Sequence, residues 1–304
     1  MYSNPDLLAT NLLIGMCRGS LGVPRVIRDL GYRDRWVPGC FPGHGPDSVP
    51  PVFAMASREA RHTVFVEFSR GAKVDARQLA RYATVTAAYL RGATNLSREE
   101  TETYDIAVLG PARHRESLVK GLEESRLRFP LLLLTRAGIV LGANSFSKAA
   151  LSKVFFPRLE VAWETIPRSW IRFNGNSGVL EVAEAVIPEV VARAVKGDTR
   201  VAATDLCRSH PLWDILGKPG RDHMNGQVCE ALAAATENEF RSHFDLDGEV
   251  LVLQRDLAAD TPMQRAGWLK KLQQLHAAFL DRLADDRPGR AERELFEEDD
   301  AAGQ

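Results

Sequence analysis

The residues best suited to chemistry lie in one stretch, Val64–Tyr82, which reads VFVEFSRGAKVDARQLARY. Its first residues predict a β-strand that carries Glu67 at its solvent end. A short glycine turn follows, and then a predicted helix in which Gln78 and Tyr82 lie four residues apart, on one face. Because a hard, oxygen-ligated ion such as Mg²⁺ needs carboxylates, Glu67 is the first candidate metal ligand.

A second acid, Asp47 in the pair Pro46-Asp47, precedes the neighbouring predicted strand. Two acids on adjacent strands form a clamp for Mg²⁺, which lowers the pKa of a bound water and offsets charge on a scissile phosphate. A Pro-Asp pair in a loop rich in proline and glycine is also a common turn. The sequence therefore leaves a metal role and a turn role open for Asp47.

Together these residues resemble the PD-(D/E)xK nucleases, the restriction-endonuclease-like superfamily, in its RecB-like form with a QxxxY helix. The resemblance covers roughly residues 5–135. It implies that Asp47 and Glu67 hold Mg²⁺ or Mn²⁺, and that Gln78 and Tyr82 arrange the site or the DNA strand. It also implies DNA as partner and phosphodiester hydrolysis as the reaction, in restriction, repair or defence against mobile DNA.

The chain departs from that family at Ser69, where the family motif has a lysine that helps to position and activate the attacking water. This position shares a face with Glu67, because side chains alternate along a strand. A serine carries no charge and cannot replace an ammonium beside a phosphate. Lys73 is the first candidate to substitute for it and Arg70 is the second, so an active deoxyribonuclease and a catalytically silent derivative both stay open.

Periodicity and breaker residues predict a mixed sheet flanked by helices in a first domain, residues 1–155. Two-sided apolar strands separated by helices are typical of a central sheet covered by helices. After an opening helix and a loop over Val37–Pro51, the expected elements are strands Val52–Met55 and Thr63–Phe68, helix Asp75–Arg91, strand Tyr104–Leu109, helix His114–Glu124, strands Leu131–Thr135 and Gly138–Leu141, and helix Ser145–Lys153.

The remaining chain changes to a mainly helical pattern, with a connecting segment at 156–200, a domain at 201–284 and an acidic, disordered tail at 285–304. The expected elements are helices Gly178–Lys196, Ala202–Arg208, Pro211–Leu216 and Arg221–Phe244, strand Glu249–Gln254, and helix Thr261–Leu283. Helices followed by a β element predict a winged-helix-like domain. That fold often reads DNA and often joins proteins.

Composition and charge set the remaining expectations. The chain is 45% hydrophobic and 26% charged, as in globular proteins, and its four cysteines are too scattered for a disulfide framework, which favours a reducing, cytoplasmic location. Asp6 and Arg18 bracket the first apolar stretch too closely for a membrane span. Residues 285–304 hold 8 acidic and 3 basic residues, so the other residues carry a net charge of +4, which permits a polyanionic partner without requiring one.

Other chemistries have weaker support. The motifs GxSxG, GxxxxGK and GxGxxG are absent from the sequence, which disfavours a serine hydrolase, an NTPase and a dinucleotide enzyme. Cys207 and His210, with His223 and Cys229, superficially resemble zinc ligands, but we expect core cysteines and surface histidines instead. The rivals to the nuclease are a non-catalytic subunit that binds DNA or assembles a complex, and a protein-interaction module acting through the winged helix and the Trp268 helix.

Overall fold

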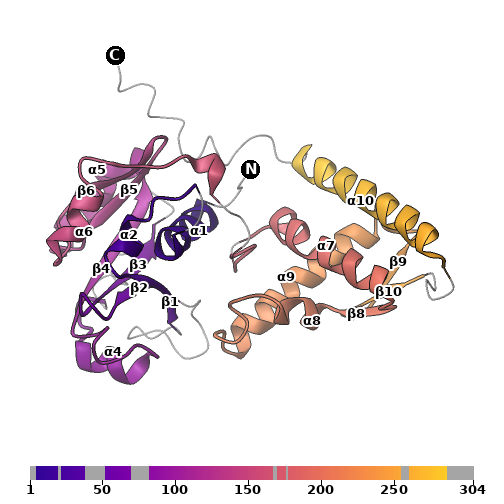
Figure 1. Ribbon diagram of the computed structural model, residues 1–304, viewed down its shortest axis with the longest axis horizontal. Helices are drawn as coiled ribbons and strands as arrows, with labels where there is room; N and C mark the ends of the chain where they lie inside the picture. Colours follow the sequence, from indigo (N-terminus) through magenta and orange to yellow (C-terminus); the bar gives the residue numbers. More distant parts are fainter. Residues whose placement is uncertain are drawn as a thin grey trace, which may run out of the picture. The chain divides into compact units, whose positions relative to one another are not determined.

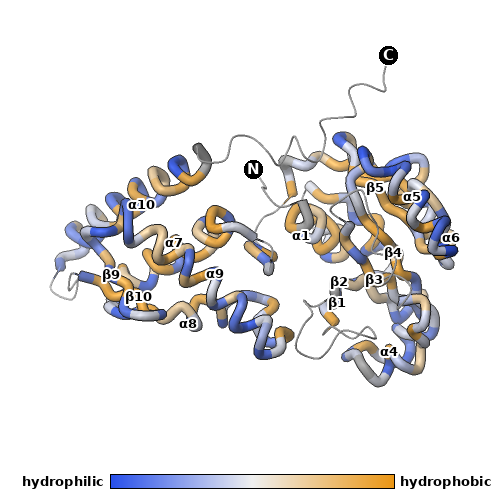
Figure 2. Tube along the Cα trace, turned by 180° about the vertical axis from the view of Figure 1, so that it is seen from behind, coloured by the Kyte–Doolittle hydropathy of each residue, from blue (hydrophilic) through white to orange (hydrophobic). Residues whose placement is uncertain are grey.

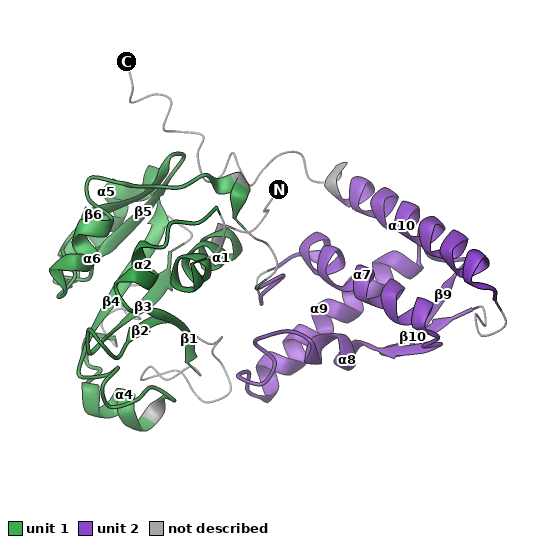
Figure 3. Cartoon of the chain, in the orientation of Figure 1, with its two compact units in different colours: residues 1–170, 291–304 green, residues 171–290 purple. Residues whose placement is uncertain are grey.

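The computed structural model describes residues 5–19, 22–37, 52–69, 82–166, 170–175, 177–254 and 260–285. The chain forms two compact units, Met1–Trp170 with Ala291–Gln304, and Ile171–Arg290 (Figure 3). The segment 156–200, expected to connect two domains, contributes a strand to the first unit and a long helix to the second.

The first unit contains a seven-stranded sheet whose strands follow one another in chain order (Figure 1). Its three central strands run parallel, and the flanking pairs are antiparallel. This confirms the predicted mixed α/β class. The strands are β1 (Arg33–Val37), β2 (Val52–Ser57), β3 (His62–Phe68), β4 (Thr103–Pro111), β5 (Leu131–Thr135), β6 (Gly138–Ala143) and β7 (Leu159–Glu160).

Helices cover both faces of this sheet. Helix α1 (Pro5–Arg18) and the short α2 (Val26–Asp29) lie on one face, where Arg18 pairs with Asp34 of β1 at 2.7 Å. The chain at Tyr82, α4 (Ala87–Ala93) and α5 (Arg115–Glu124) cover the other face, where their apolar side chains form a core with the sheet. Neighbouring residues of β1 thus point to opposite layers, as strand geometry requires.

Three local expectations for the first unit need correction. The helix predicted to run to Arg91 does not pass through residues 84–86, because Thr86 caps a new helix by accepting a hydrogen bond from the Tyr89 amide at 3.1 Å. Strand β1 was not predicted, since its sequence RDRWV lacks apolar alternation. The short helix α6 (Ala149–Val154) begins later than the expected Ser145.

The second unit has a small antiparallel sheet and packed helices. The sheet order is β8 (Arg200–Ala202), β10 (Val250–Leu253) and β9 (Phe244–Asp247). The long helix α7 (Val179–Lys196) packs against α9 (Lys218–Thr236) and α10 (Pro262–Asp285), and α8 (Ala203–Arg208) packs against α9. Figure 2 shows α10 alternating between polar and apolar residues, as the sequence predicted.

Two predicted helices of this unit differ from the structure. Residues 211–216, expected as a helix, form turns instead. Helix α9 begins at Lys218, with Pro219 in its first turn where its missing amide costs nothing, and it ends at Thr236 rather than at Phe244. None of the helices within the described ranges is both long and apolar enough to span a membrane.

Candidate functional site

Glu67 lies near the carboxyl end of β3, where its side chain is half-buried. Its backbone is level with Val108 of β4, the neighbouring parallel strand. Phe65, two residues earlier and therefore on the same face, belongs to the core formed with α4 and α5. Strand β3 is buried until its last two residues. Glu67 is the first of these, so its carboxylate lies at the edge of the apolar core.

Tyr82 meets this carboxylate directly. Its hydroxyl donates a hydrogen bond to Oε2 of Glu67 at 2.9 Å, and its side chain is only 2% exposed. The backbone around Tyr82 is held by β4, since the Tyr104 hydroxyl donates to the carbonyl of Val85, whose amide donates to the Tyr82 carbonyl. The structure therefore brings together two of the residues that the sequence singled out.

Ser69 extends the same strand beyond Phe68, with its amide donating to the Leu109 carbonyl at 2.8 Å. A methyl group built on Gly110 would lie 3.7 Å from Cβ of Ser69 and 2.8 Å from Cδ1 of Leu118 on α5. Ser69 therefore points to the α5 side of the sheet, the side of Glu67. The expected shared face of Ser69 and Glu67 is confirmed, and Gly110 gives both Ser69 and α5 the space to approach β4.

The other sequence-based site residues, Asp47, Lys73 and Gln78, with the alternative Arg70, lie outside the described residues. Within the described ranges, no group of three or more His, Cys, Asp or Glu side chains gathers. The carboxylate of Glu67 fits Mg²⁺ by its chemistry, because hard oxygen donors are what this ion binds. A complete site needs further oxygen donors, and Asp47 is the one that the sequence offers.

Arg113 and His114 were not singled out by the sequence, although they stand at the same edge of the sheet. They follow the carboxyl end of β4 and precede α5, and Nε of Arg113 donates to Nε2 of His114 at 3.1 Å. Ligands of parallel sheets bind beyond the carboxyl ends of the strands. The signal that could have found this pair is basic residues directly after a predicted parallel strand.

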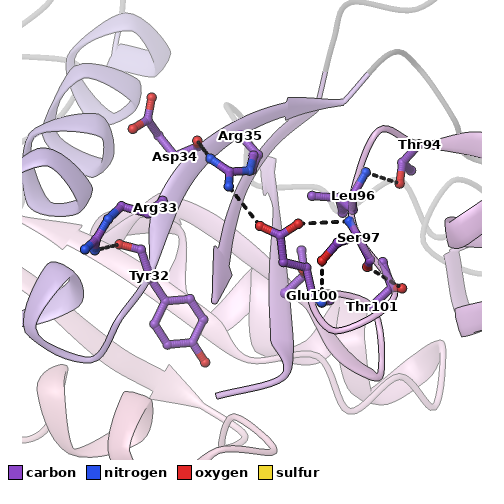
Figure 4. A network of polar contacts seen from close by, with 10 residues as sticks. Tyr32, Arg33, Asp34, Arg35, Thr94, Leu96, Ser97, Glu100 and Thr101 are labelled. Atoms are coloured by element: carbon purple, nitrogen blue, oxygen red, sulfur yellow. Dashed lines mark hydrogen bonds and ion pairs between the residues drawn. The ribbon is translucent and has the colours of Figure 1, made fainter. Parts of the chain in front are cut away.

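A second polar network fixes β1 and the loop before β4 to this layer (Figure 4). The buried carboxylate of Glu100 accepts hydrogen bonds from Arg35 of β1 at 2.9 Å and from the Ser97 amide at 2.9 Å. Burial raises the pKa of Glu100, but the hydrogen bond from Ser97 and the charge of Arg35 outweigh it and hold the pKa below its usual value. The Glu100 carbonyl also accepts from Thr63 of β3 at 2.7 Å, so the network supports the strand that carries Glu67.

A Ser–His–Asp cluster at the opposite end of β3 and β4 invites comparison with a hydrolase triad. His62 is fully buried, with Nδ1 2.8 Å from the Tyr32 hydroxyl and Nε2 3.0 Å from Oγ of Ser147. Burial raises the pKa of Tyr32, so its hydroxyl stays protonated beside this ring. Oδ2 of Asp105 lies 3.3 Å from Nε2 of His62 and accepts hydrogen bonds from the amide and the hydroxyl of Ser147 at 2.8 and 3.1 Å. The cluster therefore anchors Ser147 to β4.

The histidines considered for zinc serve the packing of the second unit. His210 is buried, not at the surface as expected, and its Nε2 lies 2.9 Å from the Phe173 carbonyl. Nε2 of His223 lies 2.8 Å from the Gly175 carbonyl. Of the two cysteines expected in the core, Cys207 is buried, whereas Cys229 is only partly buried. These contacts give both histidines a structural role.

Comparison with known proteins gave no match: no family model, no curated protein and no solved structure resembles the chain.

Proposed function

We propose that the protein is a DNA-associated, metal-dependent phosphodiesterase whose site is built around Glu67. The observation that carries this proposal is the hydrogen bond between Tyr82 and Glu67 at the carboxyl end of β3. These two residues are 15 positions apart, and the sequence predicts both as members of one motif. A solvated strand acid and an unrelated core tyrosine would have no reason to meet.

The order of elements supports the same proposal. Helix α1 is followed by the antiparallel strands β1, β2 and β3, then by helical residues, and then by β4 parallel to β3. This is the order expected for a restriction-endonuclease-like core. Phe53 pairs with Val66, so β2 begins beside Glu67, and Asp47 precedes that beginning by five residues.

The proposed chemistry assigns each residue a task. Glu67, with Asp47, would hold Mg²⁺ or Mn²⁺, which supplies a low-pKa bound water and positive charge near the phosphate. Tyr82 fixes one carboxylate oxygen of Glu67 and so limits its rotation. Lys73, or Arg70, would supply the cation that Ser69 lacks, and Gln78 would arrange the site or the strand.

For the second unit we propose a winged-helix-like fold. The chain order α7, β8, α8, α9, β9, β10, with β10 between β8 and β9, supports it. The turn at Gly248, with φ +61°, would be the wing. Because residues 171–290 carry a net charge of −3, we assign this unit to assembly with a protein partner.

The second candidate function is a catalytically silent subunit that binds DNA, and Ser69 is the observation that favours it. Ser69 stands on the face of Glu67 without a charge to offer a phosphate. A silent subunit would bind nucleic acid without metal and with strong salt dependence.

The deciding experiment compares the native protein with Glu67→Gln on single- and double-stranded DNA, with Mg²⁺, Mn²⁺ or EDTA. We expect metal-dependent cleavage that falls by at least about 1000-fold in Glu67→Gln, because an amide is a poor ligand for a hard cation. The matched control is Glu123→Gln, the same change at an exposed position of α5, which should leave the rate unchanged.

Lys73→Ala is the next variant if cleavage is seen, and it tests whether this lysine replaces the missing charge. DNA binding without cleavage, unaffected by Glu67→Gln, would instead establish the silent subunit. Equal rates for native protein and Glu67→Gln would show that any cleavage comes from elsewhere.

A further inference from the structure

Four exposed arginines gather where α1 ends, α2 begins and β1 begins: Arg18, Arg25, Arg28 and Arg33. Arg25 and Arg28 lie against Gly19, whose φ of +69° ends α1 in a left-handed turn. A methyl group built on Gly19 would lie 2.8 Å from Cδ of Arg28 and 3.4 Å from Cγ of Arg25. Residues from three elements are thus packed into one cationic cluster.

Hydrogen bonds to backbone carbonyls hold two members of the cluster in place. Nη1 of Arg28 donates to the Arg18 carbonyl at 2.6 Å, and Nη1 of Arg33 donates to the carbonyls of Arg28 and Tyr32 at 3.2 and 2.9 Å. Figure 4 shows Arg33 folded back onto Tyr32, whereas Arg35 reaches toward Glu100. These bonds use one nitrogen of each guanidinium group and fix the plane of the rest before any ligand arrives.

Residues 18–34 hold these four arginines and two acids, Asp29 and Asp34, which leaves an excess of two positive charges. In the described part of the chain, Asp34 is the carboxylate that pairs with it, through Arg18. Arg25, Arg28 and Arg33 form no ion pair there, and like charges at this spacing repel one another. Such an arrangement costs stability in the isolated protein, which indicates that an anionic partner binds it.

Fixed guanidinium forks are suited to phosphate groups, which they bind through paired hydrogen bonds. Arg33 lies four residues along β1 from Val37, which pairs with the start of β2 beside Glu67. At strand spacing, the backbones of Arg33 and Glu67 are about 17 Å apart, the axial length of about five nucleotides. Helices α1 and α2 cover the sheet face opposite to that of Glu67, so a nucleic acid that contacts both the cluster and Glu67 has to pass around the β1 edge of the sheet.

We infer that the cluster of Arg18, Arg25, Arg28 and Arg33 is a docking surface for the phosphate backbone of a nucleic acid. The inference rests on the proposed DNA substrate and assigns a binding surface to the same unit. The cluster holds the strand at a distance from Glu67 and takes no part in bond cleavage.

The test measures binding of fluorescently labelled DNA of random sequence to the full chain by anisotropy, over a range of salt concentrations. The variant replaces Arg25, Arg28 and Arg33 by Gln, and leaves Arg18 with its partner Asp34. The matched control replaces Arg200, Arg208 and Arg241, exposed arginines of the second unit, by Gln. Both variants lose three positive charges, so a difference between them reports position and not net charge.

We expect the cluster variant to bind at least about 10-fold more weakly near 0.1 M salt, and its log–log salt slope to fall by about 2 to 3, since each phosphate contact contributes about 0.9. The control should change affinity by less than about 2-fold. Equal losses in both variants, or none in the cluster variant, would overturn the inference. Arg25→Glu, a single exposed site without a hydrogen bond to the backbone of the described residues, keeps the test decisive if the triple variant does not fold.

Two further measurements distinguish this inference from the phosphodiesterase proposal and from binding to a membrane surface. DNA binding that depends on the cluster, in native protein that cleaves neither single- nor double-stranded DNA with Mg²⁺ or Mn²⁺, would end the phosphodiesterase proposal and leave the docking surface standing. Cluster-dependent binding to vesicles with anionic phospholipid, without binding to DNA, would replace the nucleic acid by a membrane surface and contradict the inference.

Discussion

The two units of the chain carry opposite charge. The first unit, residues 1–170 with 291–304, contains 24 basic and 22 acidic residues, a net charge of +2, and its residues 1–170 alone carry +7. Residues 171–290 contain 15 basic and 18 acidic residues, a net charge of −3. Because phosphate contacts dominate the affinity of proteins for nucleic acids, DNA is expected to bind the first unit. The order of elements in the second unit is not, by itself, evidence that this unit binds DNA.

The helix that would enter a DNA groove, α9, uses its polar side chains inside its own unit. Nε of Arg221 donates to the Trp213 carbonyl at 3.0 Å, and its guanidinium carbon lies 5.3 Å from the centroid of the Trp213 ring. Gln227 donates to the carbonyls of Asn174 and Ser177. Strand β9 adds the acids Asp245 and Asp247, and its turn into β10 adds Glu249. This surface repels phosphates, which is why we assign the second unit to a protein partner.

The units also differ in how they bury an ionisable group. The second unit buries His210, and burial lowers its pKa to about 4 in spite of the hydrogen bond to Phe173. The first unit buries Glu100, whose pKa is held below its usual value by Ser97 and Arg35 after the opposing effect of burial. Both groups destabilise their unit in acid, but in different pH ranges.

The largest of the expected stability effects concerns His210. Below about pH 6.5 this histidine is protonated in the unfolded chain but still neutral in the folded unit. The free energy of unfolding therefore falls as the pH drops toward 4. The loss reaches about 3 kcal/mol by pH 4. Urea unfolding of the native protein and His210→Gln at several pH values, followed by circular dichroism, measures it: the destabilisation caused by the substitution should shrink with falling pH. A constant difference from pH 7 to 4.5 would remove this contrast between the units.

Glu100→Gln should destabilise the first unit by about 2 kcal/mol at pH 7, because it breaks a buried ion pair with Arg35. The carboxylate contributes this stability above its unfolded pKa of about 4.3, and it is lost as the pH falls through the lower folded pKa. The first unit thus loses this contribution in stronger acid than the second loses that of His210.

The control for Glu100 is Glu102→Gln, which breaks the exposed pair with Arg61 and should cost less than about 0.5 kcal/mol. Thermal unfolding of both variants, monitored by tryptophan fluorescence, gives the comparison. Equal effects of the two substitutions would mean that burial of Glu100 does not increase the contribution of its ion pair to stability.

The smallest expected effect is that of Tyr82→Phe on cleavage, a loss of about 10-fold, since one hydrogen bond to a charged oxygen is removed without removing the ligand. The Mg²⁺ concentration for half-maximal rate should rise as Glu67 gains rotational freedom. Tyr89→Phe, on the exposed face of α4, is the control and should leave both quantities unchanged. An unaltered metal dependence in Tyr82→Phe would leave Tyr82 with a packing role only.

The sequence selected Glu67 and Tyr82 by local rules, but the hydrogen bond between them was not predicted. Strand alternation places Glu67 at a strand end, and helical spacing marks Tyr82 as part of a motif. The core strands β4 and β5 were also predicted, since their apolar runs are unambiguous.

Features that depend on tertiary contacts were not predicted. Strand β1 is charged, so only its pairing with β2 makes it a strand. The burial of His210 depends on Phe173, 37 residues away, and Glu100 meets Arg35 across 65 residues. The arginine cluster likewise requires a left-handed turn at Gly19 that brings α1 and α2 together. Separations of this kind leave no periodic signal in a single sequence.

The position of β1 at the border of the seven-stranded sheet has a consequence for solubility. Among the described strands it pairs on one side only, with β2, so its other side presents unpaired amides and carbonyls as a template for another chain. Arg33, Asp34 and Arg35 place charges along this template, and such charges hinder edge-to-edge aggregation. Arg33, which belongs to the proposed docking cluster, therefore also helps to keep copies of the protein apart, and a variant without the charges of β1 is expected to self-associate through β-strand addition.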